Sequence, residues 1–323
     1  MMSSLRNRLF SVMTWNIYQG ADSAPIFTPS PIPIPERVTE AFRQFLATNF
    51  LERAKAIARQ ITLEKPDLIG LQEAVIVKLI PPSPAKEVVY DFVDILLNEL
   101  ESRGLHYTVA AHRESPAVVL PEASGNNISL IDREAILVRK DSNVKIIQTQ
   151  HDNFKSNLEL EVGNLTFKVV RGWAYVDACI CGHKFRMVTT HLEPLSTKVQ
   201  EEQGNELLAG PGQTDLSLIF AGDFNSNASV SGSTTYGNLI AAGFEDTWII
   251  GGYGDGFTCC QDADLLNVES QLSERIDLIL IKNRDGWKVS EDELVGEAQT
   301  DRTKTRLWPS DHSGVIAKFI LRR

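Results

Sequence analysis

The sequence predicts an α/β (α+β) protein in which β-sheets pack together and helices cover their outer faces, within a single domain of residues 1–323. Apolar residues make up 43% of the chain and charged residues 23%, which is typical of a globular protein with a large core. Short strand-like segments are interrupted by helical ones, a pattern that favours packed sheets with helices outside. Apart from a proline cluster, no linker, repeat or low-complexity tract divides the chain, and large sandwiches reach this length undivided.

The N-terminal third is predicted to hold two strands and two helices. Residues 9–17 and 67–71 are short apolar runs typical of buried strands. A proline-rich loop at residues 25–35 precedes a helical stretch at 36–63, where apolar side chains recur at helical spacing. Residues 88–100 carry one apolar stripe, which predicts a further helix.

Beyond residue 106 the pattern becomes mainly that of short strands. Apolar and polar side chains alternate around Phe167 and Val169, and again around Phe185 and Met187, as in strands with one buried face. The predicted strands are 107–111, 128–139, 144–149, 165–176, 185–191, 216–221, 275–281 and 314–321, with helices at 196–208 and 234–242.

The net charge of −10 bears on the partners of the protein. It argues against a long, nonspecific grip on nucleic acid, which needs many basic contacts to phosphates, but it leaves a short DNA stretch or a small nucleotide open. No apolar run approaches the roughly 18–20 residues of a membrane helix, and residues 1–10 do not resemble a signal peptide. We therefore expect a soluble, cytoplasmic monomer without membrane insertion; secretion stays open if a leader has been removed.

The four cysteines match neither a zinc ribbon nor a Cys-x-x-Cys redox pair. Cys179 and Cys181 are two residues apart in a strand-like run and so point to one face, whereas Cys259 and Cys260 are adjacent. Buried, reduced thiols are the favoured interpretation. A disulfide between the two pairs is the alternative, relevant only to an exported protein.

Polar residues that a core has no reason to hold lie next to several apolar strands. Taken singly, each is more typical of a turn or a helix cap. Taken together they would gather carboxylates, amides and imidazoles in one cleft, and like charges packed so closely require a cation. Their oxygen-rich chemistry favours a hard ion, Mg²⁺ or Mn²⁺, over zinc. These residues are Asn16, Glu73, His191, Asp223, Asn225, Asp277, Asp311 and His312.

The ordered motifs W-N-I, L-Q-E, T-H-L-E, G-D-F-N, R-I-D and P-S-D-H resemble those of the endonuclease/exonuclease/phosphatase superfamily, the deoxyribonuclease I-like fold. The matches run from Trp15 to His312, nearly the whole chain. The resemblance implies a four-layer αββα sandwich, with two face-to-face mixed β-sheets flanked by helices. It also implies metal-dependent hydrolysis of a phosphate ester, with Mg²⁺ as the cofactor and Mn²⁺ as an alternative.

The resemblance also implies a role for each acidic or histidine position of the motifs. Glu73 corresponds to the main metal carboxylate, with Asn16 beside it. His312 corresponds to the general base that activates water, and Asp311 orients it and also belongs to the metal site. His191 corresponds to a second histidine, which donates a hydrogen bond to a phosphoryl oxygen.

The remaining positions follow in the same way. Asp223 and Asn225 correspond to a pair that orients the nucleophile and the phosphate or helps the leaving group, and Asp277 to an acid that aligns water or metal. Asp132 falls where relatives place an acid that holds the second histidine, with a surface charge as the alternative. Arg171, near a strand centre, falls where relatives carry a phosphate-contacting cation, with a structural ion pair as the alternative.

The motifs leave the substrate open, because specificity lies in the loops at 21–35, 81–86, 113–127 and 251–273. The leading hypothesis is a nuclease-like phosphodiesterase. The alternative is a phosphohydrolase acting on a phospholipid, as a sphingomyelinase does, or on an inositol phosphate. A catalytically inactive binding module on the same fold is less favoured, because no motif residue has been replaced. The acidic cluster 291–293 and the basic cluster 302–306 are predicted to be solvated loops.

Overall fold

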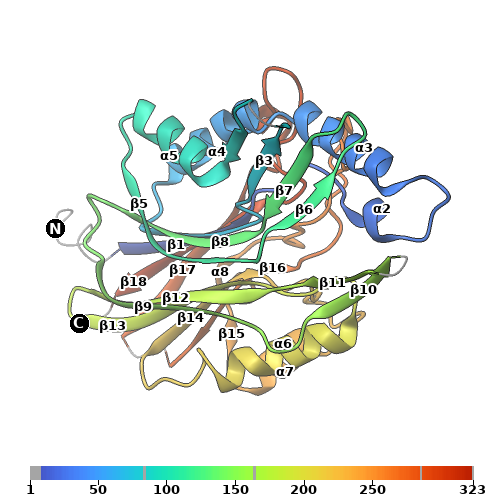
Figure 1. The fold of residues 1–323 in the computed structure, drawn as a ribbon. Coiled ribbons are helices and arrows are strands. Elements are labelled where there is room, and N and C mark those ends of the chain that lie inside the picture. The colour runs from blue at the N-terminus through green and yellow to red at the C-terminus, as the bar shows by residue number, and fades with distance from the viewer. Residues whose placement is uncertain (1–8, 83–84, 163–164, 284–285, 322–323) are drawn as a thin grey trace.

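Two six-stranded mixed β-sheets pack face to face, and helices cover the outer face of each (Figure 1). The predicted four-layer sandwich is confirmed. The computed structural model describes residues 9–82, 85–162, 165–283 and 286–321. Part of the N-terminal segment and part of the 81–86 loop considered above therefore lie outside the described residues. That the chain is one domain stays a prediction.

The first sheet is built around a parallel pair of strands, β1 and β2, whose register pairs Asn16 with Gln72 at their ends. Its other neighbours are antiparallel. In spatial order its strands are β17 (Trp287–Val295), β18 (Gly314–Leu321), β1 (Leu9–Asn16), β2 (Leu68–Gln72), β8 (Arg133–Arg139) and β5 (Tyr107–Glu114).

The second sheet also has a parallel pair at its centre, β13 and β14, whose register pairs His191 with Asp223. Its spatial order is β15 (Glu245–Asp246), β16 (Asp277–Lys282), β14 (Ser217–Asp223), β13 (His183–His191), β12 (Gly172–Ile180) and β9 (Lys145–Asn153). Two smaller sheets lie beside the sandwich: β4 (Val88–Asp91), β3 (Ile76–Ile80), β7 (Asn127–Ile131) and β6 (Val118–Pro121), and the hairpin of β10 (Leu158–Val162) and β11 (Leu165–Val169).

The core between the large sheets is apolar and tightly closed. Phe10 and Phe319 of the first sheet and Met187 and Ile219 of the second are buried in one cluster. The sheets approach closely at Gly70, where a Cβ atom would lie 2.8 Å from Thr189 Oγ1. A larger residue at Gly70, within the L-I-G-L-Q-E segment, would therefore force the sheets apart beside the polar strand ends.

Seven helices and one short 3₁₀ turn are described, and two helix predictions need correction. The predicted helix 36–63 is two helices, because the chain turns at Asn49, which has a left-handed φ of 38°. The predicted helix 88–100 begins only at Phe92, since the Asp91 side chain accepts hydrogen bonds from the N–H groups of Val93 and Asp94 and so caps the helix. The bounds are α2 Ala24–Phe27, within the proline-rich loop, α3 Ile34–Ala47, α4 Phe50–Glu64, α5 Phe92–Ser102, α6 Thr197–Ala209, α7 Thr235–Ala241, α8 Thr247–Gly251 and the 3₁₀ turn Gln299–Asp301.

Two predicted strands are each broken into two. The segment 128–139 changes sheets at Asp132, whose N–H is bonded to Ser115 Oγ at 2.9 Å and not to a strand neighbour. The segment 165–176 is interrupted before Gly172, so Arg171 lies between β11 and β12 and not near a strand centre. Both breaks place a polar side chain beside the polar strand ends, which continuous strands would not do.

The cysteine prediction is wrong for one pair. Cys259 and Cys260 form a disulfide with each other, and Cys260 and Cys181 are exposed. Adjacent side chains diverge in a regular strand, but this pair lies in the loop between α8 and β16, where both can point to one side. Among the described residues, no helix is both long enough and apolar enough to cross a bilayer.

The acidic cluster at 291–293 lies in β17, so the prediction of a solvated loop is wrong there. Strand alternation turns Asp292 inward, where it is 3% exposed, while Glu291 stays at the surface beside Lys318. Burial raises the pKa of Asp292 from 3.8 to about 8. The folded protein therefore binds a proton there that the unfolded chain releases, and stability falls as the pH rises between these values.

Asp292→Asn should remove this penalty. We expect its free energy of unfolding to exceed that of the wild type by about 3 kcal/mol or more above about pH 8, and to approach the wild-type value near about pH 4. Urea unfolding at the two pH values measures both differences. The control is Glu291→Gln on the same strand, for which we expect less than about 1 kcal/mol at either pH. An equal gain in both variants would show that burial of Asp292 is not the cause.

Candidate active site

The polar strand ends of both sheets meet at one edge of the sandwich. Asn16 ends β1, and Glu73 follows β2, its parallel neighbour in the first sheet. In the second sheet His191 ends β13, and the register places Asp223 between His191 and Asp277. Because parallel neighbours end at the same edge and antiparallel β16 begins there, five side chains from distant sequence positions are brought together.

These side chains surround a pocket of about 480 Å³. It holds Glu73 and His312 together, which the predicted chemistry requires. Asn16 and Asp277 are buried behind its wall, and Asp132 lines the adjoining cavity. The predicted residues that line the pocket itself are Glu73, Arg171, His191, Asp223, Asn225, Asp311 and His312.

Asp223 lies at the centre of the site. Its Oδ2 accepts a hydrogen bond from Asn16 Nδ2 at 3.0 Å and lies 3.4 Å from His191 Nε2 and 3.9 Å from His312 Nε2. Burial, with the nearby charge of Asp277, raises the pKa of Asp223 to about 7. A carboxyl group with this pKa can exchange a proton at neutral pH.

The G-D-F-N segment is shaped to present Asp223 and Asn225. Any side chain at Gly222 would collide with the carbonyl oxygen of Thr190, so the two central strands can lie this close only with glycine there. Asn225 has a left-handed φ of 49°, and its N–H donates to Asp223 Oδ1 at 2.9 Å. Its side-chain amide donates to the carbonyl oxygen of Leu192, also at 2.9 Å. Such unusual backbone conformations occur preferentially at functional sites.

The protonation of His191 follows from its partner. Arg171 Nη1 lies 2.6 Å from His191 Nδ1, and a guanidinium can only donate, so Nδ1 accepts and the proton of the neutral ring is on Nε2. Burial, and then the charge of Arg171, lower the pKa of His191 well below its ordinary value. His191 is therefore a neutral donor whose N–H points toward Asp223 and the pocket.

The acid that orients His312 is Asp277, not Asp311 as predicted. Asp277 Oδ2 lies 2.8 Å from His312 Nδ1, which leaves Nε2 facing Asp223. Burial alone would lower the pKa of His312, but the carboxylates of Asp277, Asp311 and Asp223 raise it well above its ordinary value. The His312 backbone is also fixed, because its carbonyl oxygen accepts a hydrogen bond from Trp15 Nε1 at 3.0 Å.

Glu73 and Asp311 are two further acids that line the pocket. Burial, and then the charge of Asp311, raise the pKa of Glu73, and burial also raises the pKa of Asp311. Glu73 has a left-handed φ of 52°, which turns its side chain out of β2 toward the pocket. Two half-buried carboxylates, one of which disfavours the charge of the other, are a donor set that suits a hard dication.

Asn16 joins Glu73 to Asp223. Its Nδ2 donates to Glu73 Oε1 at 3.2 Å as well as to Asp223, and its Oδ1 accepts from the N–H of Tyr18 at 3.0 Å. Both ends of the amide are therefore in use. Further groups that can hold a metal ion, each with ligand atoms within 4.8 Å, are Asp223 with Asp277 and His312, and Asp132 with Glu134 and His191.

Asp132 reaches His191 through Arg171 instead of holding it directly. Its Oδ2 lies 3.3 Å from Arg171 Nη1, the atom that also contacts His191. Sequence reasoning missed the buried pair behind them, Arg113 and Glu134, joined at 3.0 Å. The alternation of charge along β5 and β8 could have indicated facing strands, since Arg113 and Glu134 are in register.

The chain matches the Endonuclease/Exonuclease/phosphatase family over residues 13–312. It belongs to this family. Endonuclease/exonuclease/phosphatase proteins hydrolyse phosphate esters, and divalent-metal dependence is general among them. The reaction class that fits the pocket is therefore phosphoester hydrolysis, and the acidic and histidine groups above are where a metal ion can bind.

Solved structures agree on the fold. A humanized TDP2 from D. rerio covers 96% of this chain and 98% of its own at 18% identity, with a TM-score of 0.58. The match to an endonuclease/exonuclease/phosphatase family protein from Bacteroides thetaiotaomicron covers 98% of each chain at 14% identity, with a TM-score of 0.60. A mannosyl-6-phosphatase from the same organism covers 97% of this chain and 100% of its own at 14% identity, with a TM-score of 0.58. Among curated protein sequences, none matches significantly.

Proposed function

We propose that this protein is a magnesium-dependent phosphodiesterase of nuclease-like type, in which an activated water attacks the phosphorus atom. The arrangement around Asp223 carries the proposal: its carboxylate lies 3.4 Å from one imidazole and 3.9 Å from the other, within one pocket. Two histidines in different electrostatic surroundings can take different parts in one reaction.

His312 is the proposed base. Because Asp277 occupies Nδ1, Nε2 is the nitrogen that takes a proton from water, and the Asp277 carboxylate stabilises the imidazolium that forms. The carboxylates around His312 raise its pKa, and a cation held at Glu73 and Asp311 would offset part of their charge and so favour the neutral ring that the base requires. His191 is the proposed electrophilic partner. Its neutral Nε2–H donates to a phosphoryl oxygen, and Arg171 behind it adds positive charge as the phosphate gains negative charge.

Glu73 and Asp311 are the proposed cation ligands, with Mg²⁺ favoured and Mn²⁺ as the alternative, since both prefer carboxylate oxygen. When bound, such an ion supplies positive charge that offsets the crowded carboxylates and polarises a phosphoryl oxygen. Asn16 keeps Glu73 in place, and Asn225 and Asp223 position the phosphate and the attacking water.

A diester with a short nucleic-acid segment is the proposed substrate class. A D. rerio TDP2 in complex with a single-strand DNA product, at 18% identity and a TM-score of 0.58, supports this choice by likeness of fold. The net charge of −10 favours a short contact over a long duplex track. We keep the monomeric state and the absence of membrane insertion as parts of the proposal.

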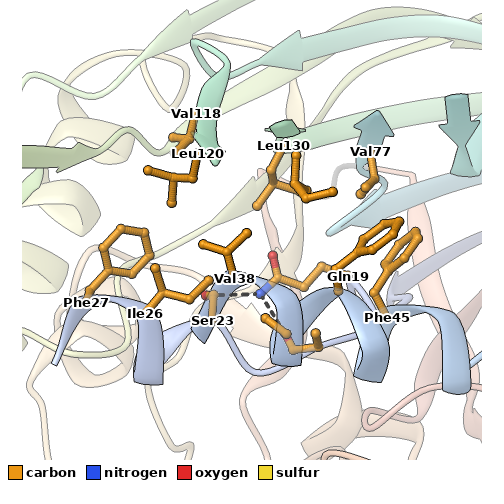
Figure 2. A pocket seen from close by; sticks show the side chains of 14 residues that line it. Gln19, Ser23, Ile26, Phe27, Val38, Phe45, Val77, Val118, Leu120 and Leu130 are labelled. Atoms are coloured by element: carbon orange, nitrogen blue, oxygen red, sulfur yellow. Dashed lines mark hydrogen bonds between the residues drawn. The ribbon is translucent and has the colours of Figure 1, made fainter. Parts of the chain in front are cut away.

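An apolar cavity favours a second candidate, a phospholipid-like diester. A cavity of about 90 Å³ adjoins the pocket, and Gln19, Ser23 and Phe27 line both (Figure 2). Figure 2 shows Val38, Leu120 and other apolar side chains converging on it. Since the N–H of Gln19 donates to Glu73 Oε2 at 2.7 Å, an apolar group bound there would lie close to the proposed metal ligands.

Hydrolysis of bis-p-nitrophenyl phosphate, with and without EDTA, tests the proposal. We expect activity that EDTA abolishes and that Mg²⁺ or Mn²⁺ restores, and a slower rate with the monoester p-nitrophenyl phosphate. DNA, RNA, sphingomyelin and inositol phosphates assayed side by side separate the two candidates. No hydrolysis with any divalent ion would instead favour the binding module.

A matched pair of variants locates the ion. Glu73→Gln should need far more Mg²⁺ for half-maximal rate, by roughly 10–100-fold, because it loses a charged ligand. Glu40→Gln, a surface change on α3, should leave the Mg²⁺ requirement unchanged. Equal Mg²⁺ requirements in Glu73→Gln and wild type would place the ion elsewhere, such as at Asp223, Asp277 and His312.

A further inference from the structure

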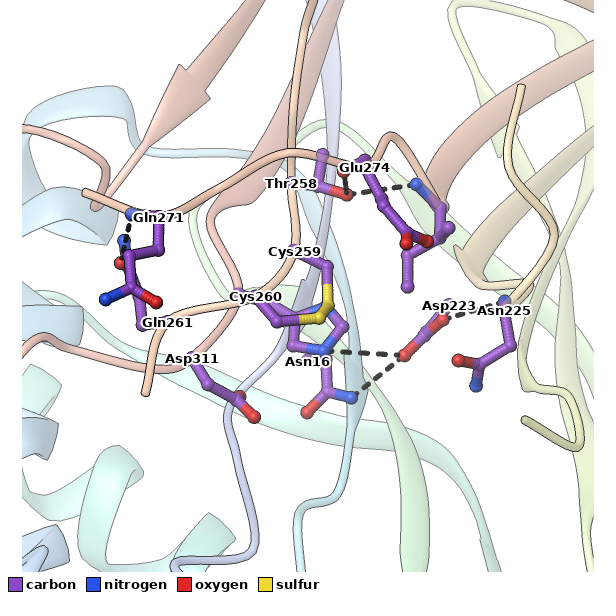
Figure 3. Close-up of a disulfide and its surroundings, with 12 residues drawn as sticks. Asn16, Asp223, Asn225, Thr258, Cys259, Cys260, Gln261, Gln271, Glu274 and Asp311 are labelled. Carbon is purple, nitrogen blue, oxygen red and sulfur yellow. Dashed lines mark hydrogen bonds and ion pairs between the residues drawn. A yellow bond between two sulfur atoms is a disulfide. The ribbon is translucent and has the colours of Figure 1, made fainter. Parts of the chain in front are cut away.

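Two sulfur atoms face the proposed catalytic pocket. Cys259 and Cys260 line it together with Asp223, Asp311 and His312. Figure 3 shows the cysteine side chains in the region bounded by Asp223 and Asp311. Cys259 is 2% exposed and Cys260 is exposed, so the pair is anchored at one residue and open to solvent at the other.

The loop that carries the pair is tied to the segment that carries His312. Cys259 forms an isolated antiparallel bridge with His312, and another with Glu274 on its other side. On either side of the pair, the N–H of Gln261 donates to the carbonyl oxygen of Asp311, and the N–H of Ser313 donates to that of Thr258, each at 2.8 Å. The sulfur atoms therefore hold a defined place relative to the imidazole.

Cys259, Cys260 and His312 make up a ligand set of their own. One ligand atom from each lies within 4.8 Å of the others. Thiolate sulfur and imidazole nitrogen are the ligands that Zn²⁺ and Cd²⁺ prefer, whereas Mg²⁺ prefers the oxygens of Glu73 and Asp311. The pocket is thus lined by a soft donor set, to which His312 belongs, and by a hard donor set.

We propose that Cys259, Cys260 and His312 form a second cation site, selective for a thiophilic dication such as Zn²⁺. The site can bind the ion when both cysteines are reduced. A bound ion occupies His312 and so prevents it from acting in hydrolysis. Binding replaces the two thiol protons with the metal ion and engages an imidazole nitrogen. The loss of hydrolysis rests on the proposed function, whereas the binding itself does not.

The disulfide form cannot bind the ion, because the ion requires two thiolate ligands and the sulfur atoms of a disulfide carry no negative charge. Oxidation by a small disulfide such as glutathione disulfide forms the Cys259–Cys260 bond and breaks that of the oxidant. The cysteines give up two protons and two electrons, and two glutathione thiols form. The state of the cysteine pair therefore decides whether a soft ion can reach His312.

Titration with Cd²⁺ in excess Mg²⁺ tests the binding, with the full chain reduced by a phosphine that is then removed. We expect one Cd²⁺ per chain and an ultraviolet thiolate-to-cadmium absorption. Both should be lost in Cys259→Ser, in Cys260→Ser and after treatment with glutathione disulfide, and His312→Gln should bind Cd²⁺ more than about tenfold more weakly. The control is the double variant Cys179→Ser, Cys181→Ser, which changes one residue near the end of β12 and one just beyond it and should bind as the wild type does.

Hydrolysis by the same samples tests the effect on His312. We expect one equivalent of Cd²⁺ or Zn²⁺ to lower the rate of the reduced wild type at least tenfold, and to leave each cysteine variant at its own initial rate. Unchanged Cd²⁺ binding without Cys259 would overturn the proposed site. Thiolate-bound Cd²⁺ with full hydrolysis would overturn the role of His312 in it. A chain that binds Cd²⁺ through thiolates yet hydrolyses nothing would contradict the proposed function and not the site.

Discussion

His312→Ala is expected to lower kcat/KM for a phosphate diester by about 10²–10⁴-fold, the range typical of a lost general acid or base. The reason is geometric: His312 lines the pocket with its Nε2 3.9 Å from Asp223 Oδ2, while Asp277 holds the other ring nitrogen. The measurement is steady-state hydrolysis of bis-p-nitrophenyl phosphate at saturating Mg²⁺, with the Mg²⁺ requirement determined for each variant.

A second variant guards against a folding defect. His312→Gln keeps a side-chain donor for Asp277 but has no basic nitrogen, so it should lose as much activity while keeping the wild-type thermal midpoint. The control is His112→Ala on β5, whose imidazole is exposed and should not affect the rate. Full activity in His312→Gln would remove His312 as the base and leave Asp223, with its pKa near 7, as the group that accepts the proton.

The fold could be predicted because its motifs lie at regular points of the architecture. The apolar strands with polar ends lie at the centre of the two sheets. Strands whose motifs follow one another in the chain are also neighbours in a sheet, as β1 and β2 are, and β13, β14 and β16. Element boundaries were harder. The start of α5 depends on the side chain of Asp91, and the break at Asp132 on the hydrogen bond that its N–H donates to Ser115 Oγ. Neither contact leaves a periodic pattern in the sequence.

The members of the site could be predicted better than their pairing. Parallel strands carry their ends to one edge, so strand direction places Asn16 beside Glu73 and His191 beside Asp223. The face-to-face packing of the two sheets then brings the two groups together. Which carboxylate contacts His312 is a different question, because Asp311 precedes it in the chain whereas Asp277 is 35 residues away. Neighbours in sequence point apart in an extended segment. The distant acid therefore reaches the imidazole, while Asp311 lines the pocket together with Glu73.

Buried charge was the least predictable feature. Arg113 lies in a segment that was predicted to be a specificity loop, and Glu134 was given no role, yet both are almost fully buried and paired across β5 and β8. Asp292 was likewise predicted to lie in a solvated loop, and it is buried in β17. In each case the second sheet or a neighbouring helix covers the face that a lone strand would leave to solvent, and that cover comes from elements far away in sequence.

Asp277→Asn is expected to lower kcat by about 10³–10⁴-fold, with little change in the Mg²⁺ requirement. The amide can present its N–H₂ group to His312 Nδ1 and so force the ring proton onto Nε2, the nitrogen that must be free to accept a proton from water. Asp277 is thus expected to act as a positioning residue, and an unchanged thermal midpoint beside the lost rate would separate this role from a structural one.

Asp311→Asn supplies the contrast, because the two acids differ in what they face. Asp311 raises the pKa of Glu73 and belongs to the proposed cation ligands, so its loss should be offset in large part by more Mg²⁺. Rate measurements across a Mg²⁺ titration distinguish the variants: rescue is expected for Asp311→Asn and none for Asp277→Asn. The reverse pattern would mean that Asp311 orients His312 during the reaction and that Asp277 is a ligand of the ion. The reason is that a higher Mg²⁺ concentration can compensate only for the loss of a carboxylate that binds Mg²⁺.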